Sequence, residues 1–147
     1  MSISQPIAAG EARHLLLFDG VCSFCNGSVR WLAARDPQAR LRFAPLQGET
    51  AAWLRARHLE IPEALETMAY VRSDAAGERV FLRSEALWRV LALLDSPWRH
   101  AAPLLRLLPR PLRDRLYLAF ARRRYQLFGK LDACPIPRPE DARRFLP

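Results

Sequence analysis

The sequence predicts a mixed α/β protein that folds as one domain. The chain has 147 residues, half of them hydrophobic, which is enough to build one packed core. Short apolar runs, typical of buried strands, alternate with longer segments in which apolar residues recur at helical spacing. This alternation indicates strand–helix–strand units and a partly parallel sheet.

The first half of the chain begins with an apolar run over residues 15–18, stopped by Asp19-Gly20, which predicts a buried strand and a turn. Residues 24–35 follow as a helix, because apolar side chains repeat there at intervals of three and four. Asp36-Pro37 ends this helix, and residues 41–44 alternate as a second strand. A weaker helix is expected to follow the second strand and to extend to about residue 58.

The second half opens with a predicted hairpin, whose strands cover residues 68–72 and 79–82 around a polar loop. Ser84 can cap the next helix, in which apolar residues share one face. A further helix, from about residue 112 to Gly129, carries an apolar face that we expect to pack on the core. The residues of that face are Leu112, Leu116, Tyr117, Phe120 and Ala121.

This order of elements, strand–helix–strand, helix, then hairpin–helix, matches a thioredoxin-like domain with a C-terminal helical extension. We expect residues 14–95 to form the redox core. We expect residues 96–147 to add the helical extension and a proline-rich arm, packed on the core as part of a single domain. A strand–helix–strand unit predicts a parallel pair with a right-handed crossover, and the hairpin adds antiparallel neighbours.

Cys22 and Cys25 form a C-x-x-C motif at the turn from the first strand into the first helix. Backbone N–H groups at a helix N-terminus stabilise a thiolate, and the thiolate is the species that attacks a disulfide. The expected arrangement leaves one sulfur exposed at the first turn and directs the other inward. The motif therefore predicts a thiol–disulfide oxidoreductase in which Cys22 attacks the substrate and Cys25 resolves the mixed disulfide.

Zinc sites also use C-x-x-C, so a structural or regulatory metal-binding domain is the alternative function. A second C-x-x-C is missing, and Cys134 with Asp19 or a histidine would have to complete the site, although none lies at a diagnostic spacing. The histidines available are His14, His58 and His100. Haem attachment is excluded, because Asn26 stands where C-x-x-C-H requires histidine. No motif for an organic cofactor is visible.

Asp19 has two interpretations that the sequence leaves open. Asp-Gly is a common turn at the end of a strand. Alternatively, the carboxylate accepts or relays a proton during exchange, and it would then serve Cys25, because a negative charge opposes a thiolate at Cys22. Residues 17–21 also look like the start of a phosphohydrolase of the haloacid dehalogenase type. Leu17 occupies the place of that enzyme's nucleophilic aspartate, which excludes this mechanism.

These residues closely resemble the DCC family of thiol–disulfide oxidoreductases, which takes its name from an Asp-x-x-Cys-x-x-Cys signature. The resemblance begins at residues 17–27 and covers almost the whole chain after residue 14. Its other segments are Arg42–Gln47, Arg83–Leu87, Pro111–Asp114, Arg124-Tyr125 and Phe128–Cys134.

The resemblance implies a thioredoxin-like fold and dithiol activity, and it assigns the motif to Asp19, Cys22 and Cys25. It also places Cys134 in a recurring C-terminal segment. The chain differs from ordinary thioredoxins because no proline precedes its third strand, where Thr67-Met68 stands. Substrate binding by that loop is therefore not carried over.

The net charge is +8, and almost all of the positive charge comes from arginine. We expect these arginines to form a solvated basic surface. No nucleic-acid module is visible, so no nucleic acid is expected as a partner. The expected partners are a thiol or disulfide substrate, protein or small molecule, and an upstream redox partner. Arginines near the apolar Leu116 and Phe120 would also suit a helix that lies on an anionic membrane surface. A helix that packs its apolar face on the core has the same arrangement of residues, and we favour that interpretation.

The first thirteen residues lack the features of a secretory signal, and no apolar stretch is long enough to span a membrane, which favours the cytoplasm. Cys134 stands before a stiff, proline-rich stretch suited to lying along a groove. We expect this arm to fold back and to bring Cys134 to the active site as an auxiliary thiol or a wall.

Overall fold

The computed structural model describes residues 13–62, 67–95, 97–132 and 139–147. A four-stranded sheet in the order β2-β1-β3-β4 forms its centre, with β1 parallel to β2 and the other neighbours antiparallel. The strands are β1 (Arg13–Phe18), β2 (Leu41–Pro45), β3 (Ala69–Asp74) and β4 (Gly77–Leu82). This mixed sheet is consistent with the predicted thioredoxin-like fold. The hairpin turn is tighter than expected, because β3 and β4 extend to within two residues of each other.

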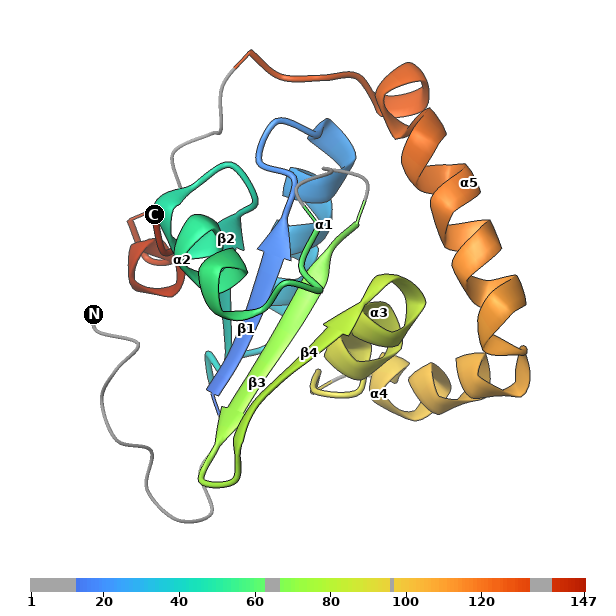
Figure 1. Ribbon diagram of the computed structural model, residues 1–147, viewed down its shortest axis with the longest axis horizontal. Helices are drawn as coiled ribbons and strands as arrows, with labels where there is room; N and C mark the ends of the chain where they lie inside the picture. Colours follow the sequence, from blue (N-terminus) through green and yellow to red (C-terminus); the bar gives the residue numbers. More distant parts are fainter. Residues whose placement is uncertain (1–12, 63–66, 96, 133–138) are drawn as a thin grey trace.

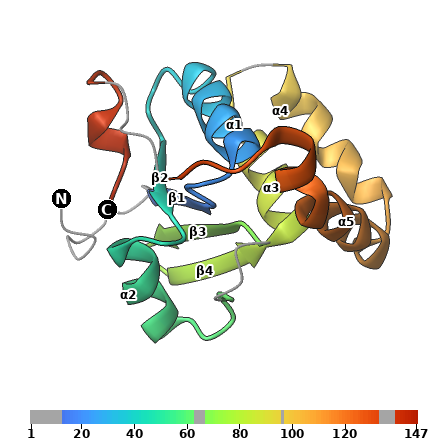
Figure 2. The same cartoon turned by 90° about the horizontal axis from the view of Figure 1, so that it is seen from above.

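Helices cover both faces of the sheet, as Figures 1 and 2 show. Helices α1 (Ser23–Ala34) and α3 (Arg83–Leu91) pack on one face, and α2 (Glu49–Arg57) packs on the other. Strand β1 is central, and its alternate side chains enter both cores, Leu16 and Phe18 on the α1 side and Leu15 and Leu17 on the α2 side. Burial on both faces explains why this strand is a continuous apolar run rather than an alternating one.

After α3 the chain forms a short helix α4 (Trp98–Ala101), a 3-10 turn η1 (Ala102–Leu107) and the long helix α5 (Arg110–Phe128). Helix α5 lies beside α1 and α3, on the same side of the sheet (Figure 2). No helix in the described ranges is long and apolar enough to cross a membrane.

The face of α5 that packs on the core differs from the predicted one. Tyr117 and Ala121 do face inward, but the other inward residues are the buried Arg113 and Arg124. Leu112 and Leu116 are exposed, Leu116 with 57% of its surface accessible. The expectation that Leu112 and Leu116 pack on the core is therefore wrong, whereas Phe120 does contact it, because its ring centroid lies 4.8 Å from that of Phe24 on α1. The inward arginines of α5 form ion pairs with carboxylates on the core, which leucine side chains could not do.

Two core partners of α5 lie at the start of α3. Arg113 contacts Glu85 at 3.1 Å, and Asp114 accepts a hydrogen bond from the Ser84 hydroxyl. Ser84 was predicted to cap α3, which is wrong, because the helix begins one residue earlier, at Arg83, and Leu82 occupies the cap position. The Ser84 hydroxyl instead ties α3 to α5.

The C-terminal residues are attached to the outer strand β2 by a buried ion pair. Arg144, in the short 3-10 turn η2 (Ala142–Arg144), contacts the carboxylate of Asp36 at 2.7 Å and donates to the carbonyls of Leu41 and Ala33. Asp36 also accepts the backbone N–H of Leu41. The Asp36-Pro37 dipeptide therefore ends α1 and also supplies the anchor for the chain end.

We expect Arg144→Leu to lower the free energy of unfolding by about 3 kcal/mol, because it removes the buried cation at 2.7 Å from the Asp36 carboxylate and leaves the more distant Arg40, at 3.7 Å. Urea denaturation followed by circular dichroism measures this loss. Arg143→Ala, at the exposed neighbouring position, is the matched control and should stay within about 0.5 kcal/mol of wild type. A loss of equal size in both variants would contradict the role of the buried pair.

Candidate active site

The C-x-x-C motif begins α1 at the carboxyl end of β1. Cys22 is the N-cap residue, and its Sγ accepts the backbone N–H of Cys25 at 3.2 Å. The side-chain amide of Asn26 donates to the carbonyls of Gly20 and Cys22, at 2.8 and 2.9 Å. This amide holds the turn against the helix, so the Cys22 sulfur stays at the positive end of the α1 dipole.

The exposure of the two cysteines is the reverse of the predicted one. None of the surface of Cys22 is accessible, whereas Cys25 is partly exposed and faces a cavity. The expectation that the first sulfur lies open at the helix start is therefore wrong. Both cysteines are free thiols in this structure.

Residues 129–131, here called the strap, cover Cys22. Gly129 ends α5 with φ of +87°, a conformation that favours glycine, and so turns the chain back toward the motif. Lys130 pairs with Cys22 as an isolated antiparallel bridge, and the N–H of Leu131 donates to the carbonyl of Val21 at 2.6 Å. Figure 1 shows this segment leaving the end of α5 and crossing above the sheet.

Asp19 is buried and is surrounded by donors. Arg124 contacts its carboxylate at 2.6 Å, the amide of Gln47 donates to it at 2.7 Å, and the N–H of Val21 donates at 3.1 Å. The Tyr125 hydroxyl also donates to it. The carboxylate thus joins the redox turn to the end of β2 and to α5.

The charges around the motif shift two pKa values in opposite directions. Burial alone would raise the pKa of Asp19, but hydrogen bonds from Tyr125, Gln47 and Arg124 outweigh it, and the pKa falls below its ordinary value. Burial raises the pKa of the Cys25 thiol well above its ordinary value, and the hydrogen bond and charge of Cys22 add to this. Asp19 therefore stays ionised near neutral pH, and Cys25 stays protonated.

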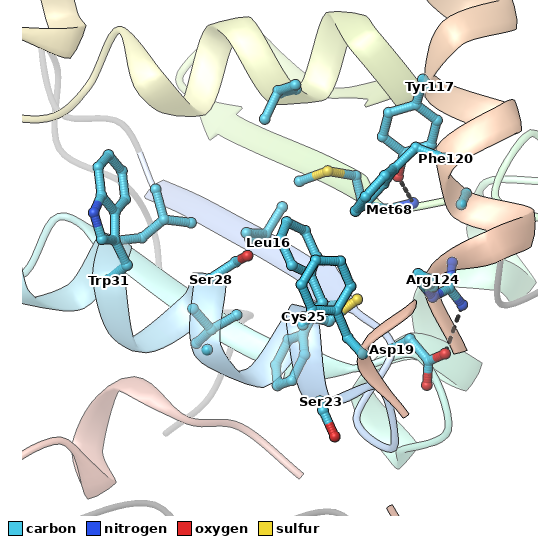
Figure 3. Close-up of a pocket in the computed structure, with 18 of the residues that line it drawn as sticks. Leu16, Asp19, Ser23, Cys25, Ser28, Trp31, Met68, Tyr117, Phe120 and Arg124 are labelled. Carbon is cyan, nitrogen blue, oxygen red and sulfur yellow. Dashed lines mark hydrogen bonds and ion pairs between the residues drawn. The ribbon is translucent and has the colours of Figure 1, made fainter. Parts of the chain in front are cut away.

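A cavity of about 690 Å³ lies beside Cys25, between α1, α3 and α5. Its lining is almost wholly apolar. In Figure 3, Trp31 lies at one end, the Asp19–Arg124 pair lies at the other, and Cys25 is next to the pair. Tyr117 accepts the backbone N–H of Met68 at 2.9 Å, and burial raises its pKa to about 12.

The structure thus brings together three of the predicted site residues, Asp19, Cys22 and Cys25. The fourth, Cys134, lies outside the described residues. Within the described ranges, no group of three or more His, Cys, Asp or Glu residues could hold a metal ion. His14 and His58 instead contact Tyr70 and Glu78.

Sequence reasoning missed Gln47, Arg124 and Tyr125 as partners of Asp19, and Gly129–Leu131 as the cover of Cys22. All of these residues belong to segments that carry the family resemblance, and that was the available signal. Their roles depend on contacts between positions more than a hundred residues apart, or on opposite sides of β2. Neither periodicity nor local spacing reports such contacts.

A family model for DCC1-like thiol–disulfide oxidoreductases matches residues 16–130. The chain belongs to this family. Among curated relatives, the uncharacterised protein YuxK of Bacillus subtilis strain 168 is 35% identical over 134 residues, which span 91% of this chain and 94% of the relative. A chloroplastic DCC family protein of Arabidopsis thaliana is 33% identical over 126 residues, spanning 86% of this chain and 71% of the relative. No solved structure matches.

The matched range ends at the strap, so it contains both motif cysteines and α5. In this DCC1-like protein the signature aspartate, Asp19, joins the turn that carries the motif cysteines to helix α5. Its contacts with Arg124 and Tyr125 span the distance from β1 to the last turns of α5. The family match therefore covers the C-x-x-C segment together with the residues that contact Asp19.

Asp19→Asn should lower the free energy of unfolding by about 3 kcal/mol at neutral pH, because Arg124 is left buried without its anion. Because the pKa of Asp19 is lower in the folded state than in the unfolded state, the ionised carboxylate stabilises the fold at pH values above its ordinary pKa. This stabilisation is lost as the pH falls through the pKa of the folded state. The gap between wild type and variant should therefore shrink below a pH of about 4. Urea unfolding across the acid range measures it, with the exposed Asp132→Asn as control. A gap that does not change with pH would contradict this account.

Leu131→Pro should make Cys22 more accessible, because proline removes the N–H that holds the strap to Val21. We expect alkylation of Cys22 by iodoacetamide to accelerate about fivefold, the effect of losing one hydrogen bond. Peptide mass spectrometry reports the rate for each cysteine separately. Leu131→Ala keeps the N–H and is the matched control, and equal acceleration in both variants would refute a strap held by this bond.

Proposed function

We propose that this protein catalyses thiol–disulfide exchange through Cys22 and Cys25, with Cys22 as the attacking thiol and Cys25 as the resolving one. The observation that carries the proposal is the hydrogen bond from the Cys25 N–H to the Cys22 sulfur at the start of α1. That contact stabilises negative charge on Cys22, and thiolate attack begins the exchange. The raised pKa of Cys25 suits a thiol that waits for the second step.

The reaction proceeds in two displacements. The Cys22 thiolate attacks one sulfur of a substrate disulfide, forms a mixed disulfide and releases the first substrate thiolate. Cys25 then loses its proton and attacks the Cys22 sulfur, which releases the second thiolate and leaves a Cys22–Cys25 disulfide. The substrate gains two electrons, and its two thiolates take up the protons that the cysteines lose.

Asp19 positions the turn in this proposal and does not transfer the proton. Its lowered pKa makes it a weak base near neutral pH, and each of its oxygens already accepts hydrogen bonds. Its negative charge helps to keep Cys25 protonated, whereas Arg124 acts in the opposite direction. Asp19 and Arg124 therefore act on the pKa of Cys25 in opposite directions, and together they leave no net charge beside it.

The strap must move before a substrate reaches Cys22, since none of that residue is accessible. We include this step in the proposed cycle. An upstream redox partner would return the protein disulfide to the dithiol form, and the cytoplasm remains the expected compartment.

Single-cysteine variants test the proposal. After mild oxidation, wild-type protein should lose the mass of two hydrogens, and its tryptic peptide over residues 14–30 should carry an internal Cys22–Cys25 disulfide. Cys25→Ser should trap a mixed disulfide at Cys22, and Cys22→Ser should trap none at Cys25. Peptide mass spectrometry after reaction with a small disulfide measures both.

Cys134→Ser, measured in parallel, reports whether the third cysteine contributes to exchange. A wild-type dithiol that cannot be cycled between oxidised and reduced forms would refute the proposed function. Trapping at Cys25 in place of Cys22 would keep the function but reverse the two roles.

A further inference from the structure

The cavity beside Cys25 has the size and chemistry of a small-molecule site. Its volume of about 690 Å³ lies within the range of roughly 300–1,000 Å³ typical of ligand pockets. Phe24, Trp31, Leu87 and Phe120 line it from three different helices. Helices α1, α3 and α5 form its walls, and it is partly open to solvent.

The charged groups of the lining, Asp19 and Arg124, lie at the Cys25 end and are paired with each other. Arg124 is bound to Asp19, and the Tyr117 oxygen accepts the Met68 N–H. A ligand that carried free carboxylates into the pocket would lose water and find no unpaired cation among these groups. An apolar ligand loses nothing comparable and gains by leaving water.

A small molecule fits this pocket better than a peptide. The cavity residues on α1, α3 and α5 belong to helices, whose backbone N–H and C=O groups bond within each helix. A peptide backbone buried there would leave its own polar groups without partners. Side chains provide most of the contacts, and these are mostly aromatic and aliphatic.

We infer that this pocket binds the apolar substituent of a small-molecule disulfide, so that substrates with aromatic or branched alkyl groups are preferred over charged ones. The inference rests on the proposed function, because it uses the same two displacements. Cys22 does not itself line the pocket, but its sulfur lies 3.2 Å from the nitrogen of Cys25, which does. In the mixed disulfide, the substituent retained on Cys22 would occupy the pocket until Cys25 releases it as a thiol.

Rates of oxidation of the reduced protein by three disulfides test this inference. The three are dibenzyl disulfide, bis(2-hydroxyethyl) disulfide and glutathione disulfide, and each rate is divided by the rate with free N-acetylcysteine to remove intrinsic reactivity. Dibenzyl disulfide should be preferred about tenfold or more, as expected for burial of a group the size of a Phe side chain.

Gly27 offers a variant that narrows the pocket. It lines the cavity, and no atom comes within 4 Å of where its Cβ would lie, so a new side chain would enter open space. Gly27→Phe should reduce the benzyl preference toward that of glutathione disulfide, and phenylalanine is also the better helix former. Arg30→Phe adds the same ring to an exposed position of α1 outside the lining and should keep the preference.

Several outcomes would overturn the inference. A wild-type protein that cycles with all three disulfides at similar normalised rates has no apolar specificity, although its proposed function stands. Retention of the preference in Gly27→Phe would exclude this pocket as its source. A higher normalised rate with a disulfide-linked apolar peptide would show that the preferred substrate is a peptide and not a small molecule. Failure to cycle with any disulfide would instead refute the proposed function.

Discussion

The buried ion pair between Asp19 and Arg124 is the contact on which the rest of the site depends. It joins the turn that carries Cys22 to a helix that begins about ninety residues later in the chain. Both side chains are almost fully buried, so neither charge can be returned to water without moving the other element. The position of α5 then fixes one wall of the cavity and the starting point of the strap.

The C-terminal extension is attached to the core by a series of polar contacts as well as by aromatic ones, such as Phe24–Phe120 and Phe43–Phe145. Arg113 and Asp114 contact the start of α3, Arg124 binds the redox turn, and Arg144 binds Asp36. Such contacts specify one arrangement, because a shift of one helical turn would leave several charges buried and unpaired. Leu112 and Leu116, on the outer side of α5, remain exposed.

Much of the fold was predictable because it depends on local patterns. The run at residues 15–18, the helical spacing after Phe24 and the hairpin each reflect a periodicity that the sequence displays directly. The inward face of α5 was not predictable in this way. A helix with Leu116 and Phe120 on one side and arginines on another normally buries the leucine side. Here the arginines have acidic partners on the core, the buried Asp19 and the partly buried Glu85, and only the tertiary structure reveals them.

The polar attachment of α5 also explains why a cavity exists beside a redox cysteine. Arg113 holds one end of the helix at Glu85, and Arg124 holds the other end at Asp19. Between these two anchors, Tyr117 and Ala121 reach the cavity, while Leu116 points to solvent. If the leucine face had turned inward, its side chains would occupy the space next to Cys25. The same two ion pairs that position the helix therefore keep the pocket beside Cys25 open.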